Sequence, residues 1–160
     1  MDKGNYQPTI LVVDDEEMVT TSLTNLFRLR TGYRVVTATS PLEALAGADK
    51  NTFDLVIADY LMPGMDGIAF LSRFKELQPM ALRILLTGYA DKESAIRAIN
   101  QVGLYQYVEK PWDNDALLVG VKNALEKGAL LRTLEEKVQE LQTAHASLKD
   151  FRHQLIRAFI

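Results

Sequence analysis

Aspartates and one lysine stand where apolar runs end, and these are the residues best placed to do chemistry. Asp59 follows the apolar run at residues 53–58, Asp14 and Asp15 follow a second run, and Lys110 closes a third. Because the carboxyl ends of parallel strands meet at one edge of a sheet, we expect these side chains to converge there. Three neighbouring carboxylates repel one another unless a cation neutralises them. The pattern therefore predicts a charged, reactive site.

The elements that must position these residues are apolar runs alternating with amphipathic segments. Strands are expected at 9–13, 33–38, 53–58, 82–86 and 104–108, and helices at 16–30, 41–49, 66–77, 92–101 and from 113 onward. Five strand–helix units in alternation predict an α/β fold with an open parallel sheet covered by helices on both faces. The first, third and fourth strands are almost continuously apolar, as strands covered on both sides are.

Punctuation residues support these boundaries. Ser40 followed by Pro41 is typical of a helix N-cap and first helical position. Gly32 is expected to end the first helix, and residues 63–67 (Pro-Gly-Met-Asp-Gly) to form a loop after the third strand. Asp113 is the expected N-cap of the last helix.

Composition excludes several function classes. The chain has 160 residues, 48% of them hydrophobic, enough for one good core. A net charge of −3 and a pI near 5.4 argue against direct nucleic-acid binding. There is no cysteine, which excludes disulfides and thiolate metal sites and favours the cytosol. No signal peptide or run of roughly 18 apolar residues is present, so we expect a cytoplasmic protein with no membrane contact.

The last helix changes character near residue 126. From Leu130 onward it has no proline or glycine, and we divide the chain into a domain at 1–127 and a coiled-coil helix at 128–160. An apolar seam with alternating three- and four-residue spacing is expected at 131, 134, 138, 141, 145, 148, 152, 155 and 159, where only His145 and Arg152 are not apolar. A second register fits better from Leu141. We expect one helix of about 45 residues and a parallel homodimer; the alternative is a helix folded back on its own domain.

Four motifs together resemble the receiver domain of bacterial two-component response regulators. They are Val-Val-Asp-Asp-Glu at 12–16, Asp59 with Met-Pro-Gly-Met-Asp-Gly at 62–67, Leu-Thr-Gly at 86–88 and Glu-Lys-Pro at 109–111. The resemblance spans roughly residues 8–127. It implies a flavodoxin-like fold with sheet order 2-1-3-4-5, and a phosphoryl group received from a histidine kinase or a phosphotransfer protein.

The resemblance also implies a role for each acidic residue. Asp59 would be the nucleophile that forms an aspartyl-phosphate. Asp15 and Asp59 would ligate magnesium (Mg2+) directly, Asp14 would act through water, and Leu61 would offer its backbone carbonyl. Magnesium is a hard cation that prefers such oxygen ligands.

The remaining expected roles concern the phosphoryl group and its readout. Thr87 would donate its hydroxyl to a phosphoryl oxygen, and Lys110 would neutralise charge, with a cis peptide at Lys110–Pro111. Thr87 and Tyr107 would form the conformational switch; Tyr105, expected on the same strand face, is the less favoured aromatic. Tyr89 is expected to slow autodephosphorylation.

Each residue also has an ordinary interpretation. The Asp14–Asp15 pair could cap the first helix, Asp59 could favour a turn, Thr87 could be a strand-end hydroxyl, and Lys110 a solvated charge. All four coincidences at the ends of four strands are improbable. Two rival functions stay open. One is a magnesium-dependent phosphatase with an aspartate nucleophile, which would need a second acid where Leu61 stands. The other is a pseudo-receiver that only assembles.

Trp112 and the C-terminal segment bear on the output that the receiver would control. We expect no enzymatic turnover by this chain itself. Trp112 resembles a receiver subgroup joined to enzymatic outputs, and no basic helix-turn-helix region follows residue 127. The chain stops inside the apolar helical segment 155–160, so an output domain is expected beyond it. The helix resembles linkers to HD-GYP cyclic di-GMP phosphodiesterases, or to diguanylate cyclases. His145 and His153 are expected to be surface or seam residues and not metal ligands.

Overall fold

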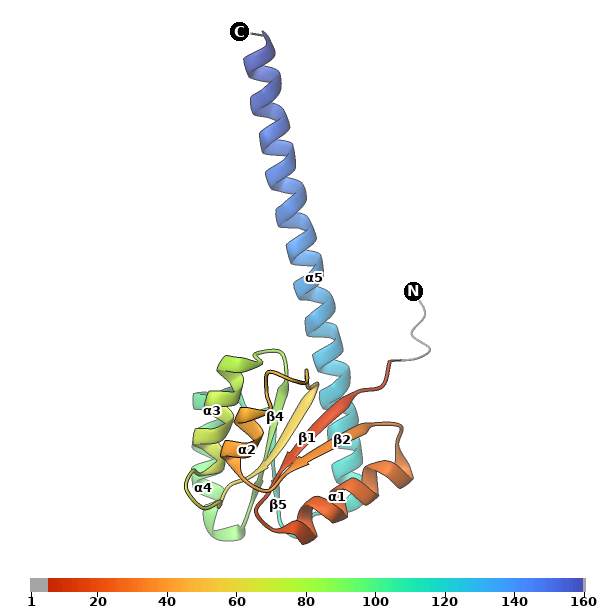
Figure 1. Cartoon of the computed structure of the whole chain (residues 1–160), viewed down its shortest axis with the longest axis vertical. Helices are drawn as coiled ribbons and strands as arrows, with labels where there is room; N and C mark the ends of the chain where they lie inside the picture. Colours follow the sequence, from red (N-terminus) through yellow and green to blue (C-terminus); the bar gives the residue numbers. More distant parts are fainter. Residues whose placement is uncertain (1–5, 160) are drawn as a thin grey trace. The chain divides into compact units, whose positions relative to one another are not determined.

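The computed structural model describes residues 6–159, so the first five residues of the N-terminus, where no signal peptide was expected, and residue 160 lie outside it. Strands and helices alternate along the chain (Figure 1). The elements are β1 (Thr9–Val13), α1 (Glu17–Arg30), β2 (Arg34–Ala38), α2 (Pro41–Ala46), β3 (Leu55–Asp59), α3 (Gly67–Leu77), β4 (Leu82–Thr87), the 3-10 turn η2 (Tyr89–Asp91), α4 (Lys92–Ala98), the π-helix η3 (Ile99–Gly103), β5 (Gln106–Glu109) and α5 (Asn114–Phe159).

The five strands form one parallel sheet in the order β2-β1-β3-β4-β5, which confirms the predicted fold. The chain runs from β1 out to the edge strand β2 and then returns to the other side of β1. The topological switch point therefore lies between β1 and β3, where open α/β sheets bind their ligands. Val13 pairs with Ala58 in that register, so Asp14 and Asp59 come next on neighbouring strands.

Helices cover both faces of the sheet, and each face has its own apolar core (Figure 1). On one face, α2, α3 and α4 supply side chains such as Phe70 and Phe74. On the other face, α1 supplies Phe27, and the beginning of α5 supplies Leu117 and Val121. Successive residues of a strand point to opposite faces, and here both faces are buried. This is why β1, β3 and β4 are apolar at nearly every position.

Several element ends differ from the sequence-based expectation because tertiary hydrogen bonds compete with regular structure. The second helix ends at Ala46 rather than at residue 49, and β3 begins at Leu55 rather than at 53. The Gln78 side chain bonds the loop between them, donating to the carbonyls of Ala48 and Asn51 (both 2.7 Å) and accepting from the Phe53 N–H (2.8 Å).

The bounds of the last helix–strand unit also differ from the expected ones. The expected helix at 92–101 divides into α4 and the π-helix η3, and the last strand begins at Gln106 rather than at 104. The first helix ends at Arg30, as expected, and Thr31 is its C-cap, since its N–H and its hydroxyl both donate to the Phe27 carbonyl. The predicted N-cap at Ser40 is confirmed by its hydrogen bond from the Glu43 N–H (3.1 Å).

The expectation that Tyr105 shares a strand face with Tyr107 is wrong. Tyr105 precedes β5 and packs against the α1/α5 face, whereas Tyr107 packs against the α2–α4 face. The alternation of the strand does not extend back to Tyr105, because the chain bends at this residue and β5 begins only at Gln106. Lys127 lies over the Tyr105 ring, 5.5 Å from its centre.

The last helix, α5, is continuous over 46 residues, as expected. Its first third, up to Gly128, belongs to the sheet domain, and a boundary between two compact units falls between Gly128 and Ala129. Among the described residues, no helix combines the length and the apolarity needed to cross a membrane.

Gly67 is where a side chain would disturb the fold most directly. A Cβ there would lie 2.2 Å from the Asp59 carbonyl oxygen and 2.8 Å from Leu85 Cδ1. Gly67→Ala should therefore lower the free energy of unfolding by about 1–3 kcal/mol, the usual cost of overpacking. Chemical denaturation measures this change. Gly32→Ala is the matched control, since its Cβ would meet nothing within 4 Å. Equal stability of the Gly67 variant and the wild type would contradict the prediction.

Candidate functional site

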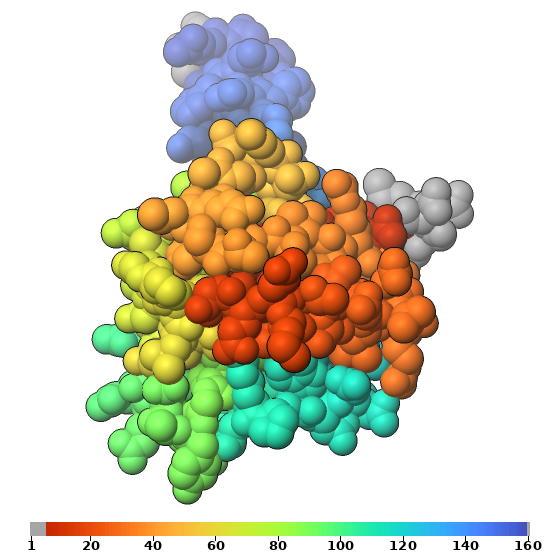
Figure 2. All heavy atoms as spheres, turned by 60° about the horizontal axis from the view of Figure 1, so that its bottom comes forward, coloured from red at the N-terminus to blue at the C-terminus, as the bar shows by residue number. Residues whose placement is uncertain are grey.

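Three carboxylates meet at the carboxyl ends of β1 and β3. Asp14 and Asp59 are buried and Asp15 is exposed, and one oxygen from each lies within 4.8 Å of the others. Figure 2 brings forward the face that is at the bottom of Figure 1, where segments following the strands meet: those near residue 17 in red, near 62 in yellow, near 90 in green and near 113 in cyan. The predicted convergence of the three acids is observed.

Lys110 provides the positive charge of the cluster. Its Nζ lies 3.0 Å from Asp59 Oδ1 and 3.1 Å from Asp14 Oδ2, and its side chain is 23% exposed. The lysine directly follows β5, and its backbone N–H donates to the Thr87 carbonyl (2.8 Å), which joins the end of β5 to the end of β4. The Lys110–Pro111 peptide is cis, as the sequence resemblance implied.

Burial and neighbouring charge shift the pKa values of this cluster. Burial raises the pKa of Asp14 above its usual value, against the hydrogen bond from the Glu16 N–H and the charge of Lys110. Burial likewise raises the pKa of Asp59, and Asp15 adds to it, while Lys110 opposes the rise. Burial alone would lower the pKa of Lys110, but its contacts with Asp59 and Asp14 outweigh burial and raise it. Lys110 therefore keeps its proton, and both buried acids would gain from more positive charge.

Thr87 ends β4 and is fully buried. Its hydroxyl is the one buried side-chain polar atom in the described part of the chain that has no hydrogen-bond partner. An unpaired buried hydroxyl lowers the stability of the fold, so such groups are uncommon in protein cores. A hydroxyl of this kind is available to an acceptor that enters the site.

The loop after β3 is built to hold the Asp59 backbone. The Gly67 N–H donates to the Tyr60 carbonyl (2.8 Å), and Asp66 caps α3 by accepting from the Ala69 N–H (2.8 Å). The contacts that a Cβ on Gly67 would make show how closely α3 approaches Asp59. Sequence reasoning treated Asp66-Gly67 only as a turn and missed this positioning role; the glycine at the helix start was the available signal.

The backbone of Glu16 is a second group that sequence reasoning missed. Its N–H donates to Asp14 Oδ1 (2.9 Å), which orients the buried carboxylate. Glu16 itself occupies the N-cap position of α1 but makes no side-chain capping bond. No side-chain pattern could have revealed a main-chain donor.

The other predicted residues are not members of the acidic trio. Leu61 is exposed and follows β3 by two residues, and Tyr107 is half-buried on the α2–α4 face. Tyr89 is 83% exposed in η2, two residues after Thr87. His145 and His153 are exposed on α5, far along the chain from the acids. The roles expected for these residues stay predictions.

The donor set fits magnesium. Three carboxylates and one ammonium leave an excess of two negative charges when all are ionised, which one divalent cation would balance. Oxygen atoms are the ligands that hard cations prefer. Asp15, the exposed member of the trio, and Asp59 are the residues that would hold the ion, with Asp14 beside them.

Known proteins are similar to this chain in fold and in sequence. Residues 10–122 match the response regulator receiver domain family. The chain is 36% identical over 146 residues to the hydrogenase transcriptional regulatory protein HoxA of Cupriavidus necator, covering 91% of this chain and 30% of HoxA. It is 35% identical to the C4-dicarboxylate transport transcriptional regulatory protein DctD of Rhizobium meliloti, covering 78% of this chain and 26% of DctD. The chain thus spans less than a third of the length of these curated relatives.

Solved structures agree. The signal receiver domain of an HD domain-containing protein from Pseudomonas fluorescens superposes with a TM-score of 0.73 at 35% identity, covering 78% of this chain and 98% of that one. NtrX from Brucella abortus superposes with a TM-score of 0.75 at 30% identity, covering 81% of this chain and 30% of NtrX.

Receiver domains of response regulators act in phosphorelay signalling, bind Mg2+ through an acidic pocket, and interact with histidine kinases or phosphotransfer proteins. The fold, the match over residues 10–122 and the acidic cluster at the switch point all indicate the same family. The chain belongs to the response regulator receiver domain family of two-component systems.

Proposed function

We propose that Asp59 is the phosphoryl acceptor of this receiver and that its phosphorylation controls the C-terminal helix. The observation that carries the proposal is the position of Asp59. Its buried carboxylate lies at the switch point of the sheet, within the acidic trio and 3.0 Å from the Lys110 ammonium. The donor would be a phosphohistidine of a histidine kinase or of a phosphotransfer protein.

The transfer needs little covalent assistance from the protein. A carboxylate oxygen of Asp59 supplies the electron pair for the new O–P bond, the P–N bond of the phosphohistidine breaks, and its electron pair returns to the imidazole. Catalysis then consists of in-line positioning and neutralisation of the transferring group. Lys110 supplies one positive charge. Magnesium, when bound by Asp15 and Asp59 with the Leu61 carbonyl, supplies the rest.

The unpaired Thr87 hydroxyl suggests how the phosphoryl group is read. A phosphoryl oxygen on Asp59 would be an acceptor for that hydroxyl, and forming the bond would satisfy a buried donor. Movement of Thr87 toward the site would free space beside β5. Tyr107 pairs with Leu85 across β4 and β5 and is half-buried, so turning its ring into the space that Thr87 vacates would bury more apolar surface. A two-state element biased in this way is how a local charge change gains a wider effect.

The C-terminal segment from residue 129 carries a line of exposed apolar side chains. Leu134 is 60% exposed, Leu141 70%, Leu148 68% and Phe151 59%. Exposed apolar residues at three- and four-residue spacing are typical of a helix that pairs with another helix. We propose that residues 128–160 form a parallel coiled-coil homodimer through which residues 1–127 communicate with an output.

Two outputs are favoured by different observations. The receiver of the HD domain-containing protein from Pseudomonas fluorescens is similar to this chain over 98% of the length of that receiver. This similarity supports an HD-type output such as a cyclic di-GMP phosphodiesterase. HoxA and DctD are named transcriptional regulatory proteins, which supports a transcriptional output as the second candidate.

The rival phosphatase hypothesis is disfavoured because Leu61 stands where the second acid of such an enzyme is expected. A pure assembly module would have no reason to bury two repelling carboxylates.

Asp59→Asn should abolish phosphorylation. After incubation with magnesium and acetyl phosphate, we expect intact-protein mass spectrometry to show one added phosphoryl group on the wild type and none on the variant. The neutral amide cannot supply the attacking carboxylate. Asp49→Asn is the matched control, because Asp49 is exposed and outside the cluster, and it should be modified like the wild type. Equal modification of the Asp59 variant would rule out this acceptor.

Tyr107 should respond to a phosphoryl mimic while Tyr105 does not. With fluorotyrosine-labelled protein, addition of magnesium and beryllium fluoride should shift the Tyr107 resonance, identified by its loss in Tyr107→Phe. Tyr105 packs on the opposite face of the sheet and serves as the internal control. An unmoved Tyr107 resonance, with other resonances confirming that the mimic has bound, would eliminate Tyr107 as the switch.

Leu148→Glu should dissociate the dimer, and Lys149→Glu should not. Leucine burial contributes about 1.5–3 kcal/mol for each side chain. The loss from two copies should therefore raise the dimer dissociation constant about 100-fold or more. Both residues are exposed on α5, so the monomer fold should tolerate either change. Analytical ultracentrifugation measures the constant. A monomeric wild type, or equal weakening by both variants, would refute the homodimer.

A further inference from the structure

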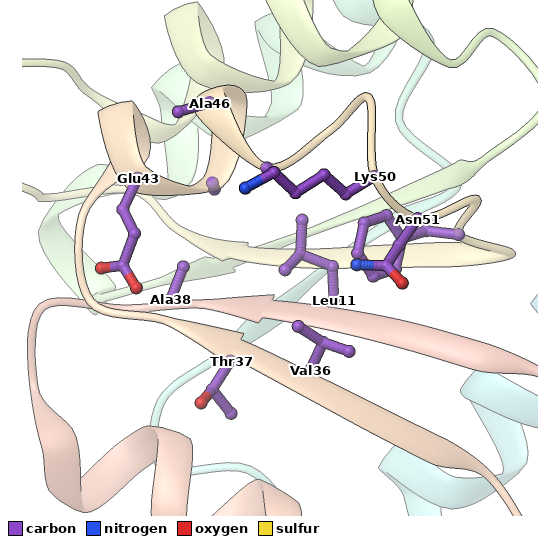
Figure 3. A pocket seen from close by; sticks show the side chains of 11 residues that line it. Leu11, Val36, Thr37, Ala38, Glu43, Ala46, Lys50 and Asn51 are labelled. Atoms are coloured by element: carbon purple, nitrogen blue, oxygen red, sulfur yellow. The ribbon is translucent and has the colours of Figure 1, made fainter.

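A pocket lies between the edge strand β2 and helix α2, away from the acidic cluster (Figure 3). Its volume is about 370 Å³, at the lower end of the range typical of small-molecule sites. It is lined by Leu11, Val36, Thr37, Ala38, Glu43, Ala44, Ala46, Gly47, Lys50, Asn51 and Phe53.

The pocket exists because small residues line it along α2 and at the end of β2. Ala44, Ala46 and Gly47 come from α2 and its C-cap, and Ala38 ends β2. These side chains leave open the space that larger ones would fill. The floor is apolar and firm, because Leu11 and Phe53 are buried and the Phe53 ring packs on Phe74.

The far wall is also held in place. The loop that carries Lys50 and Asn51 is bonded to the Gln78 side chain at Ala48, Asn51 and Phe53. Ser40 caps the other end of α2. A wall fixed at both ends reduces the ordering that a ligand must impose on binding.

Opposite charges flank this apolar floor. Glu43 lies in α2 and Lys50 in the loop that follows it, and both are exposed. Figure 3 shows the Lys50 side chain extending over the pocket above Leu11, with its nitrogen directed toward the side where Glu43 stands beside Ala38. Among the described residues, the Glu43 carboxylate accepts only from the Thr39 hydroxyl, at 3.4 Å, and Lys50 forms no ion pair. Both charges therefore remain available to a ligand.

We propose that this pocket binds a small zwitterion with an apolar body, namely a free apolar α-amino acid. Its side chain would cover Leu11, Val36 and Phe53. Its ammonium group would pair with Glu43, and its carboxylate with Lys50. The site is separate from the phosphoryl chemistry, since neither Asp59 nor Lys110 lines it.

Amide NMR shifts of the isotope-labelled whole chain test the proposal. Free leucine, methionine and phenylalanine are the probes, and at least one should produce saturable shifts at Val36, Thr37, Gly47 and Asn51. For the best probe, the analogue that lacks the ammonium group and the analogue that lacks the carboxylate should each bind about tenfold more weakly, the usual cost of one charge-assisted hydrogen bond.

Variants assign the two ends of the ligand. Lys50→Met should weaken binding of the amino acid about tenfold and leave binding of the analogue without a carboxylate unaffected. Glu43→Gln should also weaken binding of the amino acid about tenfold, but should leave binding of the analogue without an ammonium group unaffected. Ala46→Leu fills the pocket from an exposed position and should abolish all binding. Asp59→Asn should bind as the wild type does, so this test stands apart from that of the phosphoryl acceptor. The proposal is overturned if no probe gives saturable shifts at these amides, or if Ala46→Leu binds as tightly as the wild type.

Discussion

The structure depends on holding two like charges together at the end of a parallel sheet. Because Val13 pairs with Ala58, the next residues on β1 and β3 bring Asp14 and Asp59 side by side in a buried place. Two unit charges about 4 Å apart interact by about 4 kcal/mol at an effective dielectric constant of 20, so the arrangement costs free energy unless it is balanced. Lys110 supplies part of the balance from the end of β5 and touches both acids. The remaining negative charge explains why a divalent cation suits the site.

Much of the surrounding structure serves this arrangement. The Glu16 N–H orients Asp14, the absence of a side chain on Gly67 lets α3 approach the Asp59 backbone, and the Lys110 N–H joins the ends of β4 and β5. Thr87 remains the unpaired member. The excess negative charge suits a divalent cation, and that cation, Lys110 and the unused Thr87 hydroxyl would together hold a group that carries acceptor oxygens. The proposed phosphoryl acceptor follows from this imbalance.

The regions remote from the acids have a different character. The pocket beside β2 results from small side chains on α2 and from a loop fastened by Gln78, and it involves no repelling charges. The segment from residue 129 exposes leucines along its length, a surface that is stable in water only at a cost. Each region has unused binding capacity, but of a kind unlike the phosphoryl site: one suits a small amphipathic molecule, the other a second helix.

The sequence by itself determined the architecture and the set of acidic residues. Alternating apolar and amphipathic segments specify a parallel α/β sheet, and in such a sheet the strand ends must converge, so Asp14, Asp15, Asp59 and Lys110 were predictable as neighbours. Tertiary structure alone decided where elements end and which faces some residues occupy. The Gln78 side chain bonds the loop that follows the shortened α2, and a bend before β5 places Tyr105 on the face opposite Tyr107. The pocket beside β2 and the Glu16 donor were equally hidden. The physical reason is that periodicity reports only whether a residue is buried, whereas hydrogen bonds between distant residues, main-chain donors and unfilled space arise only when the elements pack.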